Sequence, residues 1–304
     1  MTREELNKKK QKKISNEVNR SKRKKIILFF FKILMILIAF FGLFYLFNKY
    51  IFTNKIIVKE ERISNEKIPD SFNGTKIVQF SDLHYGSTFF MDKVKEIVKL
   101  INVRNPDLIF FTGDLIDKNY TLSAKEQEEL ILELSKLNAS IGKYAVIGDE
   151  DKDSFLTIFN QSDFTILNND FDLVYNDSET PILLVGISSK LQSASNVDKA
   201  FSYFNSETYN SDIYTITLIH EPDLADDIVS FYHSDLILAG HSHNGNIRSP
   251  WGTPYKIDGA HKYIDEYYSL NNSELYISSG LGTNDLGIRF LCLPSVNFFR
   301  LSNK

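Results

Sequence analysis

The sequence predicts an α/β fold with a mixed β-sheet, preceded by one N-terminal transmembrane helix. Three observations lead to this prediction. Residues 26–47 form an apolar stretch that contains a single charge. From residue 76 onward, short apolar runs of strand length alternate with segments of helical spacing. The last third of the chain is richer in strand-like runs than in helical ones, which favours a mixed sheet over a purely parallel one.

The first 25 residues are strongly basic. They contain eleven Lys or Arg residues and three Glu, a net charge of +8, whereas the whole chain carries −4, so the remainder carries −12. Basic residues beside a membrane span stay in the cytoplasm and are attracted to anionic lipid. An acidic body repels phosphate backbones, so we expect no nucleic-acid partner.

The apolar stretch after this tail has the length of a membrane span. About 20 apolar residues cross a bilayer as a helix, and residues 26–47 contain only Lys32 as a charge. Tyr45 and Tyr50 lie at its far end, where interfacial aromatic residues are common. A cleaved signal peptide is the alternative, but the region is too long and no Ala-x-Ala-like cleavage site follows it. We therefore predict a single-pass cell-membrane protein with a cytoplasmic N-terminus and an extracytoplasmic body.

The chain divides by these criteria into four predicted parts: a basic cytoplasmic tail (1–25), a transmembrane helix (26–50), a linker with a first strand (51–75) and a folded domain (76–304). Apolar runs in the folded domain predict strands at 76–80, 107–111, 143–147, 164–167, 181–187, 214–219, 236–239, 275–280 and 296–301. Helical spacing predicts helices over 94–103, 124–137, 155–159 and 223–231. The single cysteine, Cys292, excludes an internal disulfide, and its apolar neighbours place it in the core.

Five of these strands end in residues that can bind a metal ion. They are Asp82 and His84, Asp114, Asp149, His220, and His241 with His243. Sites in α/β sheets gather at the carboxyl ends of strands. One such Asp or His alone is more often a turn, a helix cap or a hydrogen-bonded loop residue, so the joint pattern carries the inference. Three carboxylates and four imidazoles exceed the needs of one ion and suit two metals about 3.5–4 Å apart. The other two histidines, His233 and His261, are interpreted as surface or loop residues.

In their order and spacing, these segments resemble the calcineurin-like metallophosphoesterase family, in particular a membrane-anchored bacterial branch of it. The matching segments are Asp82-Leu83-His84, Gly113-Asp114, His220 and Gly240-His241-Ser242-His243. The resemblance covers about residues 56–301. It implies two mixed β-sheets packed face to face with helices outside, which makes four layers.

The resemblance also implies a set of ligands and a reaction. Asp82, His84 and His243 would hold the first metal. Asp149, His220 and His241 would hold the second, and Asp114 would bridge both. A hydroxide between two divalent ions (Mn, Fe or Zn) would attack the phosphorus of a phosphate ester.

The third motif departs from the family. The family reads Gly-Asn-His followed by Asp or Glu, and this chain reads Gly148-Asp149-Glu150-Asp151. Asp149 can bind the same metal as the usual Asn, with one more negative charge. Glu150 replaces the His that helps to protonate the leaving group, and it is a candidate general acid if its surroundings raise its pKa. This departure keeps an alternative function open, a membrane-tethered module that binds metal but hydrolyses little. A zinc peptidase is disfavoured because the chain lacks a His-Glu-x-x-His helix.

The substrate is predicted only from the location and from one loop. Arg248 follows the histidine pair and is a candidate phosphate-binding cation. Trp251, the only tryptophan, is interpreted as an anchor of this loop or as an apolar wall near the phosphate. Gly280 and Gly282 are placed where a backbone could approach the metals closely, although a plain turn explains them equally well. An extracytoplasmic membrane location suggests phosphate esters of lipids or of envelope precursors as substrates.

Overall fold

The computed structural model describes residues 2–304 except 193–194, 208, 255 and 284–286. The chain forms two compact units, Met1–Asn48 and Lys49–Lys304. The first unit consists of helix α1 (Arg3–Phe47), none of whose described residues is buried. The helix is long and apolar enough to cross a membrane, with a mean hydropathy of 2.8 over its apolar window. A helical segment that is apolar on all sides and unburied by protein, as residues 26–47 of α1 are apart from Lys32, is typical of a membrane span.

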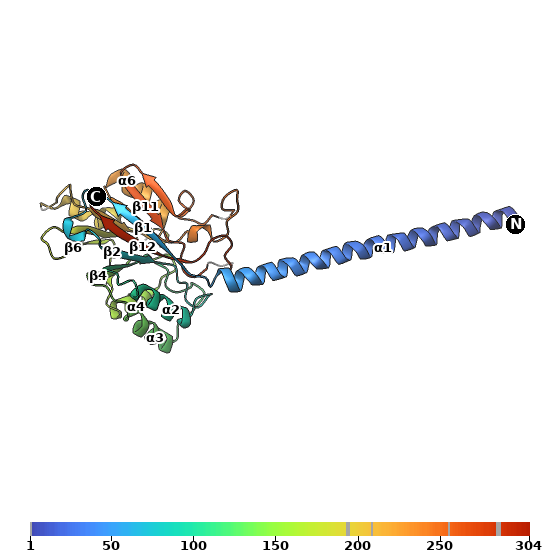
Figure 1. The fold of residues 1–304 in the computed structure, drawn as a ribbon, viewed down its shortest axis with the longest axis horizontal. Coiled ribbons are helices and arrows are strands. Elements are labelled where there is room, and N and C mark those ends of the chain that lie inside the picture. Colours follow the sequence, from blue (N-terminus) through green and yellow to red (C-terminus); the bar gives the residue numbers. More distant parts are fainter. Residues whose placement is uncertain (1, 193–194, 208, 255, 284–286) are drawn as a thin grey trace. The chain divides into compact units, whose positions relative to one another are not determined.

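The second unit contains two six-stranded sheets among its described residues (Figure 1). The first sheet has the order β1 (Ile57–Ser64), β12 (Ser295–Ser302), β2 (Lys76–Phe80), β3 (Leu108–Phe111), β4 (Gly142–Ala145) and β5 (Thr165–Ile166). The second has the order β10 (Tyr267–Leu270), β11 (Ser273–Ile277), β9 (Leu236–Ala239), β8 (Thr215–Leu218), β7 (Ile182–Gly186) and β6 (Asp170–Val174). The strands β2 to β5 are parallel, as are β7, β8, β9 and β11, whereas β12, β6 and β10 each run antiparallel to a neighbour. Both sheets are therefore mixed, and the predicted fold class is confirmed.

Successive side chains of each strand point to opposite faces of its sheet, so one face packs against helices and the other against the second sheet. In β2, Val78 packs against helices α2 (Met91–Asn102), α3 (Ala124–Leu134) and α4 (Asp153–Gln161), whereas Ile77 faces the second sheet. Helices α5 (Val197–Ala200) and α6 (Ala225–Phe231) cover the outer face of the second sheet. The central strands β3 and β9 are buried on both faces, which explains why they read as continuous apolar runs.

Two strands have no counterpart among the predicted elements, and both lie at a sheet edge. The strands β6 and β10 are only partly buried, so their sequences lack the apolar run that marks the central strands. The strand β1 forms one edge of the first sheet and pairs with β12 over its whole length. Short helical turns complete the unit at Asn48–Phe52, Asp70–Phe72, Ser202–Asn205, Pro222–Leu224 and His243–Gly245.

Candidate metal centre

The predicted ligands follow strands whose carboxyl ends meet at one edge of the two sheets. Five of them leave their strand in a left-handed conformation: Asp82 (φ 51°), His84 (φ 43°), Asp114 (φ 61°), His241 (φ 64°) and His243 (φ 48°). Non-glycine residues adopt this conformation rarely, and strained backbone of this kind concentrates at functional sites.

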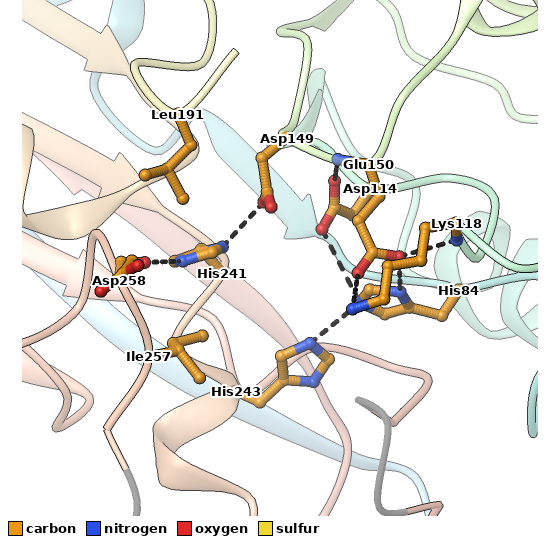
Figure 2. A pocket seen from close by; sticks show the side chains of 10 residues that line it. All are labelled: His84, Asp114, Lys118, Asp149, Glu150, Leu191, His241, His243, Ile257 and Asp258. Carbon is orange, nitrogen blue, oxygen red and sulfur yellow. Dashed lines mark hydrogen bonds and ion pairs between the residues drawn. The ribbon is translucent and has the colours of Figure 1, made fainter.

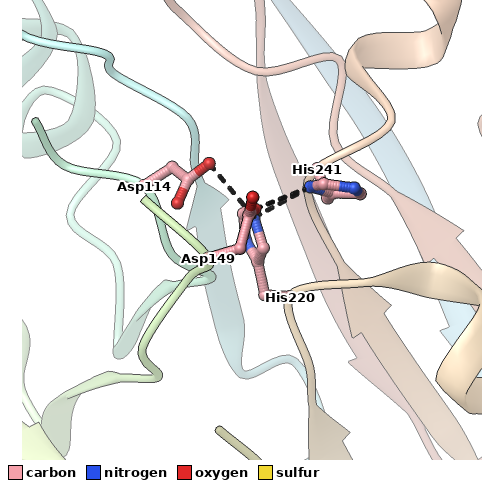
Figure 3. Close-up of side chains that lie close together, drawn as sticks. All are labelled: Asp114, Asp149, His220 and His241. Atoms are coloured by element: carbon pink, nitrogen blue, oxygen red, sulfur yellow. Dashed lines mark hydrogen bonds and ion pairs between the residues drawn. The ribbon is translucent and has the colours of Figure 1, made fainter. Parts of the chain in front are cut away.

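One cluster contains Asp114, Asp149, His220 and His241, with ligand atoms that all lie within 4.8 Å of one another (Figure 3). Oδ1 of Asp149 lies 2.9 Å from Nε2 of His220 and 3.0 Å from Nδ1 of His241. Oδ2 of Asp114 lies 3.2 Å from the same Nε2 of His220. Two imidazole nitrogens and two carboxylate oxygens thus converge on one point.

The remaining nitrogen of each imidazole is held by a backbone carbonyl. Nδ1 of His220 donates to the carbonyl oxygen of Thr112 at 2.7 Å, and Nε2 of His241 donates to that of Asp258 at 2.5 Å. These bonds leave Nε2 of His220 and Nδ1 of His241 with their lone pairs toward the cluster. A metal-binding histidine is normally held in this way, so the donor set fits a divalent cation.

A second cluster contains Asp82, His84 and His243. Nε2 of His84 lies 3.0 Å from Nε2 of His243, which in turn lies 3.6 Å from Oδ1 of Asp82. Oδ2 of Asp114, which faces His220 in the first cluster, lies 3.8 Å from Nε2 of His84. Its other oxygen, Oδ1, accepts the backbone N–H of Glu150 at 2.9 Å. One oxygen of Asp114 therefore faces both clusters.

The protonation of these groups is set by burial and by their mutual contacts. Burial raises the pKa of Asp82. Burial also works against ionised Asp149, but hydrogen bonds with His220 and His241 outweigh it and lower the pKa of Asp149. Burial alone would lower the pKa of His220, but the charges of Asp114 and Asp82 and the hydrogen bonds with Asp114 and Asp149 together raise it well above its usual value. Protons and metal ions compete for the same atoms, so cation binding weakens as the pH falls.

Glu150, the candidate general acid, contacts the predicted metal ligand His84. Its Oε2 accepts from Nδ1 of His84 at 3.1 Å and from the backbone N–H of Lys118 at 2.9 Å. Although burial alone would raise the pKa of Glu150, the bond with His84 and the nearby Lys118 lower it to about 2. In this arrangement Glu150 is an acceptor that orients His84. Its role as a general acid stays a prediction, because a general acid must carry a proton near neutral pH.

Asp151 is a structural part of the centre that sequence reasoning missed. It is buried and accepts backbone N–H groups from Asp114 at 2.9 Å, Leu115 at 2.8 Å and Gly148 at 2.8 Å. Burial and the charge of Asp114 raise its pKa to about 7. The side chain ties the loops after β3 and β4 together. Its place in the Gly148-Asp149-Glu150-Asp151 motif was the only available signal.

Arg289 was also missed, and no motif marks it. It is fully buried, and its Nη2 lies 3.1 Å from Nδ1 of His243. Its Nε donates to the carbonyl oxygen of Gly282 at 3.0 Å. Burial, together with the charges of His84 and Arg289, lowers the pKa of His243 well below its usual value, so the imidazole stays neutral. Cys292 is buried as predicted, and its Sγ donates to the carbonyl oxygen of His243 at 3.2 Å.

Two glycines allow close packing behind the ligands. At Gly113 (φ +94°), a Cβ atom would overlap Nδ1 of His220 and lie 2.7 Å from Cα of Gly148. At Gly280 (φ +67°), a Cβ would lie 2.9 Å from both Cβ of Asp82 and Nδ1 of His243. The backbone at Gly280 therefore lies close to two predicted ligands, and its approach to the metals stays a prediction.

A cavity of about 260 Å³ opens over the two clusters (Figure 2). The described residues that line it are His84, Asp114, Lys118, Asp149, Glu150, Leu191, His241, His243, Ile257 and Asp258. Lys118 is the only lysine or arginine in this lining.

Arg248 and Trp251, which follow the histidine pair, were expected to contribute to the substrate pocket. Arg248 does not line the cavity; its guanidinium donates to Asn244 and, at 2.5 Å, to Oδ1 of Asp265. Trp251 is 92% exposed, so it neither anchors the loop nor forms a wall of the pocket. Both interpretations relied on distance along the chain, whereas the turn at Ser249–Gly252 leaves the tryptophan in solvent.

Buried histidines and carboxylates at one edge of two packed mixed sheets define a candidate metal-binding protein. The model of the calcineurin-like phosphoesterase family matches residues 75–245, more than half of the chain, and the chain belongs to this family. It is therefore a hydrolase that acts on phosphate ester bonds.

Relatives along most of the chain agree with this assignment. The uncharacterized metallophosphoesterase YkuE of Bacillus subtilis is 34% identical over 264 residues, which cover 85% of this chain and 90% of that protein. The UDP-2,3-diacylglucosamine pyrophosphatase LpxG of Chlamydia muridarum is 25% identical over 299 residues, covering 77% of this chain and 86% of that protein. A transmembrane protein with a metallophosphoesterase domain from Danio rerio is 28% identical over 206 residues, covering 62% of this chain and 45% of that protein.

Proposed function

We propose that the chain is a membrane-anchored phosphoesterase with two divalent metal ions. The first ion would be held by Asp82, His84 and His243, the second by Asp149, His220 and His241, and Asp114 would be shared. The observation that carries this proposal is the position of Oδ2 of Asp114, which lies 3.2 Å from Nε2 of His220 and 3.8 Å from Nε2 of His84. The bridge would use this one oxygen, because Oδ1 accepts the N–H of Glu150.

The chain's own residues prepare the centre for phosphate. When bound, two divalent ions supply Lewis-acid charge for phosphoryl oxygens and lower the pKa of water. The carbonyls of Thr112 and Asp258 fix the orientation of His220 and His241. Lys118, in the lining of the cavity, adds a positive charge where an anionic ester would enter.

The experiment that tests the proposal measures metal and turnover in the same preparation. Full-length protein purified without added metal should contain about two ions per chain by elemental analysis. It should hydrolyse a chromogenic phosphate ester with manganese and lose this activity after chelation. Metal-loaded protein without turnover for any divalent ion would favour the alternative, a membrane-tethered metal-binding module.

Membrane anchoring is the second part of the proposal. The apolar helix α1 follows a tail of net charge +8, which supports a cytoplasmic N-terminus and an extracytoplasmic body. The name of the Chlamydia relative gives it a lipid-linked substrate, and we extend this class, lipid or envelope phosphate esters, to the present chain. Protease added to sealed spheroplasts should remove the body and leave the basic tail intact; a fully protected body would contradict this orientation.

A substitution of Glu150 tests its role as an orienting acceptor. Glu150→Gln removes the charge that holds Nδ1 of His84, so we expect metal affinity to fall by about 10- to 100-fold, with turnover at saturating manganese largely retained. Turnover should change equally for esters with good and with poor leaving groups. The matched control is Glu129→Gln, which makes the same change at a surface ion pair with Lys125. A loss confined to poor leaving groups would instead restore the general-acid role.

Two cations near the centre should differ in their effect on substrate binding. Lys118 lines the cavity, where its Nζ lies 3.4 Å from Oε1 of Glu150, and Arg248 is held by Asn244 and Asp265 outside that lining. We expect Lys118→Ala to raise KM for an anionic ester by about tenfold, because a nearby positive charge is lost, and Arg248→Ala to change it less than twofold. Steady-state kinetics with metal-saturated protein measures both. The reverse order would return Arg248 to the role that the sequence suggested.

A further inference from the structure

The surface beside the metal centre carries an unusual exposed tryptophan. Trp251, the only tryptophan of the chain, is 92% exposed. Its backbone is ordered by a tight turn, in which Ser249 and Gly252 exchange two N–H···O bonds of 3.0 Å and Oγ of Ser249 accepts the N–H of Trp251 at 3.2 Å. The turn therefore holds a large apolar side chain in solvent, where it has nothing within the protein to bury it. Isolated exposed apolar residues are common. A tryptophan that a tight turn holds almost fully in solvent, however, indicates that its side chain inserts into another surface.

A second exposed apolar residue lies on the neighbouring loop. Ile247 forms a bridge with Phe290, and the backbone N–H of Arg248 donates to Phe290 at 3.0 Å. The next residue, Leu291, is 53% exposed and adopts a φ of 53°, which is rare for a leucine. Trp251 and Leu291 thus project from two hydrogen-bonded loops.

The turn belongs to the edge that holds the candidate metal centre. The segment that contains it begins after His243 and returns to the cavity at Ile257 and Asp258, and all three residues line that cavity. A surface that received Trp251 would therefore lie beside the opening of the site.

The chain also enters the folded unit at this same edge. The strand β1 runs parallel to β12, which is antiparallel to β2, so β1 begins where β2 delivers its ligands. The N–H of Ile57 donates to Pro294 at 2.9 Å, and that of Ser295 donates to Gly280, the glycine packed against Asp82 and His243. The first residues of β1, which are nearest to α1 in sequence, therefore lie at the edge of the sheet that carries the predicted metal ligands.

The connection to α1 is short. The residues 48–56 separate the end of α1 from the start of β1. Ten consecutive Cα steps span at most about 35 Å, less than the roughly 45 Å width of a unit of this size. Because the connection joins the folded unit at the edge that carries the predicted metal ligands, this edge can reach the bilayer in which α1 would lie.

We propose that the loop pair Ile247–Gly252 and Phe290–Leu291 docks on the lipid bilayer that holds α1, with Trp251 in the interfacial layer. The cavity then opens toward the membrane surface, and the substrate is a phosphate ester carried by a lipid of that bilayer. The docking rests on the proposed membrane anchoring, and the substrate class rests on the proposed phosphoesterase activity. Tryptophan is enriched at membrane interfaces because its ring is apolar and its N–H remains hydrated.

The single tryptophan makes the docking directly measurable. In full-length protein reconstituted into phosphatidylcholine vesicles, lipids brominated near the headgroup should quench Trp251 emission by about half and shift it to the blue. The matched control is the double variant Trp251→Phe, Phe231→Trp. Phe231 is 77% exposed at the end of α6, at the opposite edge from the ligands, and its replacement should not be quenched. No quenching of Trp251, or equal quenching in both proteins, overturns the docking. A blue shift without bromine quenching also overturns it and indicates a second copy of the chain as the occupant.

Measurements of turnover distinguish a failure of the lipid-substrate proposal from a failure of the proposed phosphoesterase activity. For Trp251→Ala in vesicles, the ratio of turnover on phosphatidic acid to turnover on p-nitrophenyl phosphate should fall about tenfold. An unchanged ratio contradicts the lipid substrate. Wild-type protein that hydrolyses neither compound while Trp251 is still quenched would remove the phosphoesterase activity and leave the docking in place.

Discussion

Replacing Asp114 by Asn is expected to reduce phosphoesterase turnover by at least about 10³-fold and to lower the metal content from about two ions per chain toward one or none. The reason is the position of Oδ2, which faces His220 and His84 from the same side chain. An amide keeps the shape of the carboxylate but has no charge, and it presents an NH₂ group that cannot bind a cation. Elemental analysis and steady-state kinetics of full-length protein measure the two effects.

A matched control exists elsewhere in the chain. Asp163 is an exposed turn residue with φ 61°, the same backbone angle as Asp114. Asp163→Asn therefore makes the same chemical change in the same backbone conformation, away from the site, and should leave metal content and turnover unaltered. Full metal content with normal turnover in Asp114→Asn would exclude a shared carboxylate, and the proposed centre would fail with it.

Replacing Gly113 by Ala is expected to destabilise the body by about 3 kcal/mol or more, because the added Cβ overlaps the ring of His220 and the backbone of Gly148. For a domain of this size, that loss lowers Tm by about 10 °C. The metal-binding atoms of His220 would also shift, so metal content should fall. Thermal unfolding of the full chain in detergent, followed by circular dichroism, measures the change in Tm.

Gly74 separates steric overlap from the cost of the backbone conformation. Its φ is +90°, close to the +94° of Gly113, but nothing lies within 4 Å of its ideal Cβ position. Gly74→Ala therefore carries only the conformational penalty, about 1 kcal/mol, which corresponds to a Tm lowered by about 3 °C. Equal losses in the two variants would show that Gly113 does not pack against His220 as described.

The central strands and the ligand pattern could be predicted from sequence because one physical cause produces both. A strand covered on both faces is mainly apolar, as β9 is throughout, and polar residues that form a site, such as His241, follow its carboxyl end. The edge strands β6 and β10 escaped prediction because partial burial removes the apolar run.

Residues that act on the ligands through tertiary contacts could not be predicted in this way. Arg289 contacts His243 across 46 residues of sequence, and nothing in its local pattern indicates a buried position. Arg248 is the opposite case, because it is near the histidine pair in sequence but its guanidinium donates to Asp265 in space. The protonation of Glu150 likewise depends on His84, 66 residues away, and no local pattern contains that information.

The position of β12 has a consequence for biosynthesis. This strand is the last of the chain, yet it lies between β1 and β2, and its residues pair with partners more than 200 positions earlier. While the ribosome is still making the C-terminal segment, β1 has no hydrogen-bonding neighbour and β2 exposes one edge. The first sheet can close only after β12 has been made, so a chain that lacks Ser295–Ser302 should be left incompletely folded and be degraded by quality-control proteases.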